Sequence, residues 1–71
     1  MTKDEIKKIW LEELNIDSVD EDQDFFEIGG HSLIMAKVQA RIQTELNKEV
    51  DMETLFRNPT IDSMTKAVIE T

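Results

Sequence analysis

Cysteine is absent from this sequence of 71 residues. Its absence excludes disulfide bridges and thiolate metal sites, and it is usual for proteins of a reducing compartment. Long apolar runs are absent too. No stretch approaches the roughly 20 residues that span a bilayer, and the opening Met-Thr-Lys-Asp lacks the features of a secretory signal. We therefore expect a cytoplasmic protein with no membrane partner.

Basic residues are scarce, and their scarcity limits the possible partners. Eight Lys and Arg face sixteen Asp and Glu, which gives a net charge of −8. Most of this charge, −7, belongs to residues 1–31, and residues 32–71 carry the remaining −1. Such a field repels phosphate backbones, so we expect no nucleic-acid partner. It favours encounter with basic protein surfaces, unless its only effect is to keep the protein soluble.

A first helix is predicted between Thr2 and Leu14, within a single small domain that covers residues 1–71. Thr2 and Glu5 have the spacing of a capping box at its start. Asn15 suits the left-handed residue that ends such a helix. The helical period is carried by one apolar stripe, Ile6, Ile9, Trp10 and Leu14, which we assign to the core.

A second helix is predicted from Ser32, or just after it, to about Leu46. Its core stripe recurs with helical period: Ile34, Met35, Val38, Ile42 and Leu46. The opposite face, beside Ser32, carries Leu33, Ala36, Lys37 and Ala40, with Arg41 at its edge. The alternatives are that Lys37 and Arg41 are merely solvated charges and that Leu33 lies at the edge of the core.

Two further helices complete an all-α fold. Asp51 can cap a short helix that contains Leu55 and Phe56 and ends at Asn58-Pro59, because the residue before proline disfavours the helical region. Thr60 can cap a last helix with the apolar stripe Ile61, Met64 and Val68. We therefore predict a four-helix bundle with three longer helices and one short helix.

The long connection between the first two helices, residues 15–31, lacks any regular period. Connections of this length are usually functional or disordered. We predict an ordered loop, with a short helical turn near residues 20–25, and we expect at least one phenylalanine to be deeply buried. Five apolar anchors support this interpretation: Ile16, Val19, Phe25, Phe26 and Ile28.

The only two glycines and the only histidine directly precede one serine, as Gly29-Gly30-His31-Ser32. Glycine allows a sharp turn with positive φ, and serine is a preferred N-cap, so the stretch can serve simply as a tight helix start. It also suits a phosphate. Gly29, Gly30 and the first helical turn can offer amide donors at the positive end of the helix dipole.

Two other chemistries are excluded by the residues themselves. A serine hydrolase needs a base that can reach the serine, but His31 is adjacent to Ser32 and no second histidine exists. A calcium loop is suggested by alternating aspartates at 20, 22 and 24, but Phe25 and His31 occupy the positions that need glycine and glutamate. We expect neither a catalytic residue nor a metal site.

The stretch from Asp24 to Leu33 reads D-F-F-E-I-G-G-H-S-L and resembles the signature of peptidyl carrier proteins, the thiolation domains of nonribosomal peptide synthesis. The resemblance continues through A-R-I at residues 40–42 and L-F-R-N-P-T-I at residues 55–61, so it covers essentially the whole chain. Acyl carrier proteins of fatty-acid synthesis usually have aspartate at the position of His31.

This resemblance implies a fold of acyl-carrier type and a carrier without catalytic activity. Ser32 would be the attachment point for 4′-phosphopantetheine, which a phosphopantetheinyl transferase transfers from coenzyme A. Gly29, Gly30 and His31 would shape the approach to it. The arm would hold an aminoacyl or peptidyl thioester for adenylation, condensation, thioesterase or tailoring enzymes. These partners would meet the monomeric carrier at Leu33, Ala36, Lys37 and Ala40.

Several alternatives remain open on the sequence. We expect a freestanding carrier, since the chain begins with methionine and shows no flanking linker, although a domain excised from a synthetase looks the same. The carrier can instead serve a polyketide or hybrid pathway. The rival from another class is a small acidic helical adaptor in which Ser32 is only a cap. The cargo and the final product are not encoded in these residues.

Overall fold

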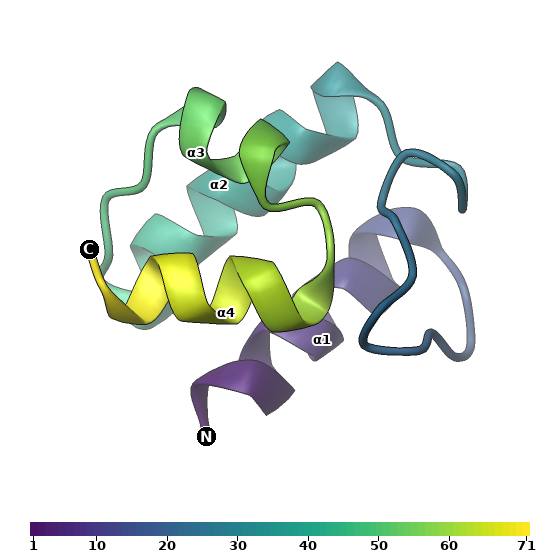
Figure 1. The fold of residues 1–71 in the computed structure, drawn as a ribbon, viewed down its shortest axis with the longest axis horizontal. Coiled ribbons are helices and arrows are strands. Elements are labelled where there is room, and N and C mark those ends of the chain that lie inside the picture. The colour runs from purple at the N-terminus through teal and green to yellow at the C-terminus, as the bar shows by residue number, and fades with distance from the viewer.

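The computed structural model describes residues 1–71 and consists of four helices without any strand, which confirms the predicted all-α class. The helices are α1 (Thr2–Leu14), α2 (Ser32–Leu46), α3 (Met52–Arg57) and α4 (Ile61–Ile69). Three are longer and α3 is short, as predicted. Figure 1 shows α4 in front of α1 and α2, with α3 above it and the long loop along one side. None of the helices has the length and apolar character to cross a membrane.

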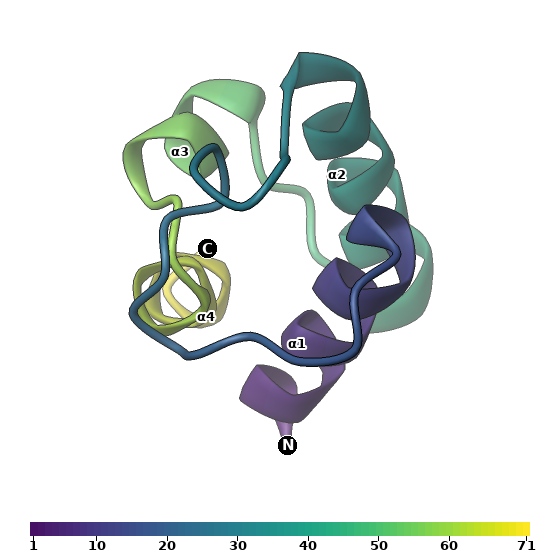
Figure 2. The ribbon, with the colours of Figure 1, turned by 90° about the vertical axis from the view of Figure 1, so that its right-hand side faces the viewer.

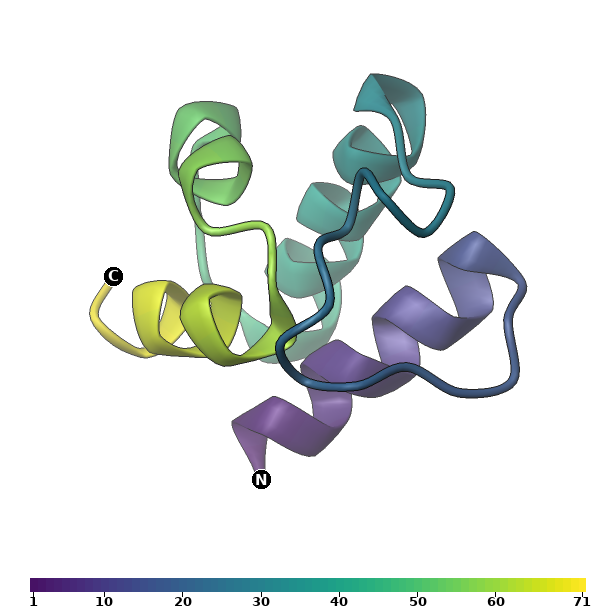
Figure 3. The same ribbon diagram turned by 45° about the vertical axis from the view of Figure 1, so that its right-hand side comes forward.

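The helices pack around one core. α1 contacts α2 and α4, and α3 contacts the same two helices, an arrangement that Figure 3 shows from the side. Thirteen apolar side chains are buried together, Trp10 and Phe25 being the largest. The Trp10 indole donates to Met64 Sδ over 3.3 Å, so its polar atom is satisfied inside the bundle. The predicted stripes of the helices supply most of this core.

The helix ends confirm some predicted caps and correct another. Asn15 ends α1 in the left-handed conformation, at φ 56° and ψ 49°. Asp51 accepts from the Thr54 amide at 2.8 Å, and Thr60 forms a capping box with Ser63. The capping box predicted for Thr2 and Glu5 is wrong. α1 begins at Thr2 itself, and the Met1 carbonyl receives the Glu5 amide, so Thr2 lies inside the first turn.

The long loop contains hydrogen-bonded turns and no helix. Near residues 20–25, where a short helical turn was expected, it has a single turn in which the Gln23 amide donates to the Asp20 carbonyl at 3.2 Å. Two backbone hydrogen bonds fasten the loop to the opposite side of the bundle. The Phe25 amide donates to the Pro59 carbonyl at 2.7 Å, and the Asp62 amide donates to the Glu21 carbonyl at 3.1 Å. In Figure 2 the loop runs in front of the bundle from the end of α1 toward α3 and then to α2. The loop is therefore ordered, as predicted.

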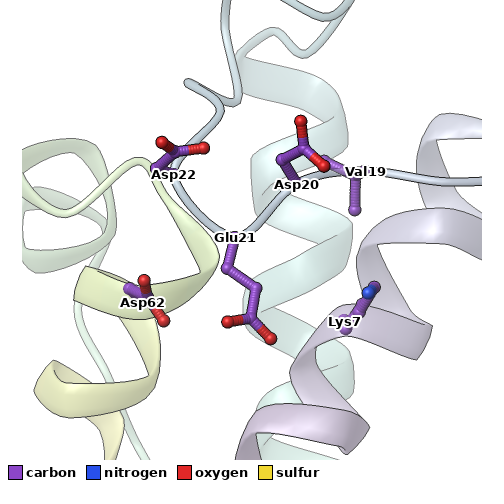
Figure 4. A pocket seen from close by; sticks show the side chains of 6 residues that line it. All are labelled: Lys7, Val19, Asp20, Glu21, Asp22 and Asp62. Carbon is purple, nitrogen blue, oxygen red and sulfur yellow. The ribbon is translucent and has the colours of Figure 1, made fainter.

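Ion pairs hold the same part of the loop. Lys3 binds Asp62 at 2.8 Å and Glu21 at 3.3 Å, and these carboxylates raise the pKa of the Lys3 ammonium. A shallow surface depression of about 450 Å³ lies at this junction. Figure 4 shows its lining side chains, with the loop between α1 and α4. Its lining is mostly acidic: Lys7, Val19, Asp20, Glu21, Asp22 and Asp62. The contacts attach the middle of the loop to both helices.

Candidate functional site

Ser32 is the first residue of α2, and its side chain is exposed. The N-cap position belongs to His31, whose backbone is extended at φ −151° and ψ 179° and whose carbonyl accepts the Met35 amide at 2.9 Å. The prediction that the helix starts at Ser32 is confirmed, and the alternative that Ser32 serves as its cap is wrong. No side chain caps this end of the helix. The Ser32 hydroxyl therefore makes no capping hydrogen bond at the start of the helix.

The three serines of the chain differ in a way that favours Ser32 as a reactive site. Ser63 belongs to the capping box of α4, where its hydroxyl lies 2.7 Å from the Thr60 hydroxyl. Ser18 is exposed in the loop, away from any helix start. Ser32 alone combines exposure with the first turn of a helix.

The first turn of α2 offers amide donors to a ligand. The amides of Ser32, Leu33 and Ile34 precede the first bond of the helix ladder, which is made by Met35, and none has an acceptor in the protein. Free amides at the positive end of a helix dipole stabilise an anionic group. No acidic residue lies in this turn to oppose such a group. The site therefore fits a phosphate attached at Ser32.

Gly30 is required by close packing. A Cβ at this position would overlap the ring of Phe25 and lie 2.6 Å from the Phe25 carbonyl oxygen. The Gly30 amide donates to that same carbonyl at 2.9 Å. It is therefore occupied, and the prediction that it offers a donor to a phosphate is wrong. Gly30 instead brings the chain against the buried Phe25 ring two residues before Ser32.

Gly29 is required by backbone conformation. Its φ of +105° lies in the region that side chains rarely adopt, although a methyl group at this position would meet no other atom within 4 Å. The two glycines thus have different roles: Gly29 adopts the positive φ of the turn, and Gly30 allows the backbone to pack against Phe25. Together they direct the loop into the start of α2.

The face of α2 beside Ser32 is exposed as predicted. Leu33 is 73% exposed, so the alternative that it lies at the core edge is wrong. Ala36, Lys37 and Ala40 are also exposed. A shallow groove of about 640 Å³ runs along this face toward α1 and has a largely apolar surface; its lining consists of Glu13, His31, Leu33, Ile34, Ala36, Lys37 and Ala40. The groove includes both chain neighbours of Ser32.

Arg41 lies at the border of this face and is not a free solvated charge. Its guanidinium binds Glu45 at 2.6 Å, Glu12 at 2.8 Å and Glu13 at 3.3 Å, and only 23% of its side chain is exposed. The carboxylates, Glu45 foremost, raise the pKa of Arg41. Arg41 in turn lowers the pKa of Glu45. The cluster joins the end of α1 to α2 and fixes Glu13 at the wall of the groove.

The role of Glu13 was not predicted from the sequence. The pair Arg41–Glu45 has the i, i+4 spacing of a helix pair and could have been found. The pairs with Glu12 and Glu13 depend on how α1 crosses α2, and no local pattern indicates them. The structure gathers no three His, Cys, Asp or Glu residues into a possible metal site.

Comparison with known families matches residues 4–68 to the family described as "Phosphopantetheine attachment site". Among curated proteins, Gramicidin S synthase 2 of Brevibacillus brevis is 37% identical over 71 residues, which cover 100% of this chain. The chain spans about 2% of the length of that relative. The same small share holds for other curated relatives from peptide and polyketide-peptide synthesis.

Solved structures agree with this fold. A peptidyl carrier protein in complex with the phosphopantetheine transferase Sfp and coenzyme A has a TM-score of 0.94 at 28% identity, covering 100% of this chain and 92% of that one. BlmI, a type-II acyl carrier protein from Streptomyces verticillus involved in bleomycin biosynthesis, has a TM-score of 0.91 at 30% identity, covering 97% of this chain and 83% of that one.

Proposed function

We propose, from the premise that this chain belongs to the phosphopantetheine attachment-site family, that Ser32 is the residue that carries the group. The observation that supports this assignment most strongly is the exposed hydroxyl in an uncapped first turn of α2, whose amides have no acceptor in the protein. In loading, the Ser32 hydroxyl gives up its proton, and its oxygen attacks the phosphorus of coenzyme A that bears the pantetheine. The P–O bond of the pyrophosphate bridge breaks, 3′,5′-ADP leaves, and a phosphodiester remains on Oγ. When attached, 4′-phosphopantetheine supplies a thiol that forms thioesters.

The residues around Ser32 position it and contribute no catalysis of their own. The free amides of Leu33 and Ile34 lie in the turn that would face the new phosphodiester. Gly29 and Gly30 direct the chain into α2 through a positive φ and a close approach to Phe25. His31 supplies the backbone cap and lines the groove. We assign the protein the role of a carrier, not of an enzyme.

We further propose that the cargo is an aminoacyl or peptidyl group of nonribosomal peptide-type biosynthesis. The signature ending in Gly-Gly-His-Ser supports this class, as do relatives named as peptide synthetases. A polyketide or hybrid pathway is the alternative, because one relative at 37% identity is the polyketide synthase-nonribosomal peptide synthetase ffsA of Aspergillus flavipes. Thioesters released from protein isolated from its native cell would identify the cargo.

The partners we propose are a phosphopantetheinyl transferase, an adenylation enzyme and condensation, thioesterase or tailoring enzymes. They would dock on the exposed face of α2, where Leu33, Ala36 and Lys37 line the groove. We also propose that the carrier is freestanding and meets them by diffusion. The net charge of −8 supports this, since charge assists diffusional encounter. An antibody should then detect a species about the size of a single carrier domain in native extracts, and a species the size of a multidomain synthetase would contradict it.

The assignment of Ser32 is tested by loading the apo protein in solution. Coenzyme A, Mg²⁺ and a phosphopantetheinyl transferase of broad specificity are added, and the intact mass is measured. We expect the mass to rise by one phosphopantetheine, and we expect Ser32→Ala to abolish the rise. Ser18→Ala is the matched control and should load normally, because Ser18 lies in the loop away from any helix start. Loading of Ser32→Ala would refute the assignment.

A further inference from the structure

Four aromatic rings form a continuous series from the core to the surface. Trp10 packs edge-on against Phe25 at 5.0 Å between ring centroids, and Phe25 packs edge-on against Phe26 at 5.4 Å. Phe26 then stacks on Phe56 of α3 at 5.7 Å, with the rings 27° apart. The loop and α3, which are distant in sequence, thus meet through the last two rings. Figure 2 shows the loop passing in front of α3.

The outer two rings are not needed to complete the core. Trp10 and Phe25 are fully buried, whereas Phe26 is 40% exposed and Phe56 is 39% exposed. Because the two rings stack on each other, their exposed parts form one small contiguous aromatic patch on the surface. The position of Phe26 is also fixed, because its amide donates to Asp24 Oδ1 at 2.8 Å. The aromatic pair Phe26–Phe56 is therefore a preformed surface.

The charges around this aromatic pair are predominantly negative. Asp24 accepts from the Phe26 amide, and Glu27 follows Phe26 in the chain. Glu53 lies one helical turn before Phe56 and pairs with Arg57 at 3.2 Å, which leaves the carboxylates in excess. Aromatic faces attract cations, and arginine is the commonest cation in such contacts. Arginine is also enriched among the residues that dominate binding energy at interfaces.

The pair lies within reach of a partner that acts on Ser32. Phe26 precedes Ser32 by six residues, and six residues span at most about 20 Å. A standard interface covers about 800 Å² on each partner, an area wide enough to include both. The groove beside Ser32 extends toward α1, whereas the aromatic pair lies where the loop meets α3. The two surfaces can therefore contact one enzyme at different points.

We propose that the aromatic pair Phe26–Phe56 is a second docking surface of the carrier, which receives a basic side chain, arginine by preference, of the enzyme that loads Ser32. The cation lies against the rings and its charge meets the surrounding carboxylates. This inference rests on the proposed function, because it presupposes that a transferase acts on Ser32. It adds a contact on the α3 side, away from the exposed face of α2.

The test compares loading kinetics of variants that keep the pair apolar but change its aromatic character. The apo protein, coenzyme A, Mg²⁺ and the same transferase are used, and kcat and KM for the carrier are measured together with the Tm of each variant. Phe56→Leu and Phe26→Leu remove the ring and keep an apolar side chain, whereas Phe56→Trp keeps a ring that binds cations well. Ile69→Leu, at an exposed apolar position on α4, is the control.

We expect both leucine variants to raise KM about two- to fivefold, the size of a cation–π contact at an exposed site, with kcat unchanged. Phe56→Trp should keep the KM of the unaltered protein or lower it, and Ile69→Leu should leave it unchanged. If Phe26→Leu fails to fold, Phe56→Leu and Phe56→Trp decide the matter alone. A lower Tm with unchanged KM in the leucine variants would overturn the inference, because the pair would then only stabilise the packing of the loop against α3. An unaltered protein that does not load would instead refute the proposed function.

Discussion

Phe25 and Phe26 are adjacent in the sequence but have different roles in the structure. Phe25 is fully buried between Trp10 and Gly30, whereas Phe26 remains 40% exposed. The sequence predicted that the loop is anchored by these residues and that at least one is deeply buried, which is confirmed. It could not predict which one, because the loop has no regular period and the direction of each ring depends on the turn that follows.

The two phenylalanines should therefore differ in their contribution to stability. Phe25→Ala should lower the free energy of unfolding by about 3–5 kcal/mol, the usual cost of emptying a buried aromatic site. Phe26→Ala should lower it by only about 1–2 kcal/mol, because part of the ring is already in water. Urea unfolding measures both values. Equal losses for the two variants would contradict the burial described here.

Gly30 gives a second prediction at the scale of one residue. Gly30→Ala places a methyl group against the Phe25 ring and its carbonyl oxygen, and neither can yield easily inside the bundle. We expect the free energy of unfolding to fall by about 1–3 kcal/mol, as for other overpacked sites. Loading of Ser32 should slow, because the displaced chain leads directly into α2. A variant as stable as the unaltered protein would show that the approach is looser than the structure indicates.

The starts of the helices show how well caps can be predicted from the sequence. Asp51 and Thr60 were predicted correctly as caps because a cap is a local contact within four residues. At the start of α1 the same reasoning failed, because Met1 provides the backbone cap and the helix begins one residue earlier than the capping box requires. At α2 the predicted start at Ser32 is correct, although the N-cap is the extended His31 and not the serine. The capping preferences of single residues therefore predict that a helix is present, but they predict its first residue less accurately.

The cap of α3 makes the stability of this element dependent on pH. Hydrogen bonds from Thr54, by its side chain and its amide, lower the pKa of Asp51 below the usual value of 3.8. A carboxylate with a depressed pKa stabilises the fold above its unfolded pKa, near 4, and this stabilisation is lost as the pH falls through the depressed value. Glu45, whose pKa Arg41 lowers, contributes in the same direction.

Two substitutions distinguish the effect of the Asp51 capping hydrogen bond from the effect of titrating the Asp51 carboxylate. Asp51→Asn keeps a capping oxygen and removes the ionisable group, whereas Asp51→Ala removes both. We expect Asp51→Ala to be less stable at neutral pH, and Asp51→Asn to lose less stability than the unaltered protein between pH 5 and pH 2. Thermal unfolding followed by circular dichroism across this range gives the comparison. Identical acid profiles for Asp51→Asn and the unaltered protein would exclude the cap as a source of the pH dependence.

The exposed face of α2 gives a prediction about partners. Leu33→Glu puts a charge where an apolar side chain is 73% exposed and should leave helicity and Tm unchanged. Loading by a transferase should slow by roughly fivefold or more if Leu33 is an interface anchor. Ile69→Glu, at an exposed apolar position on α4, is the control, because it makes the same change of charge away from the face of α2. Unchanged loading of Leu33→Glu would remove Leu33 from the proposed partner surface.

At the scale of the whole molecule, the contacts that hold the site in place are distant in sequence and were not predictable. Arg41 joins α2 to the end of α1, and Lys3 joins the loop to α4 through Glu21 and Asp62. The fold class, the four helices and the exposed face beside Ser32 follow from periodicity and motif, which are local properties. The ion pairs and the fit of Gly30 against Phe25 depend on how the elements cross.

The central claim is that Ser32 carries the prosthetic group in the cell, and peptide mass spectrometry of protein purified from its native source tests it most directly. The account predicts phosphopantetheine on the peptide that contains Ser32, with the peptides of Ser18 and Ser63 unmodified. Protein that is wholly unmodified under conditions in which the other carriers of that cell are loaded, or a group attached to Ser18 or Ser63, would contradict it.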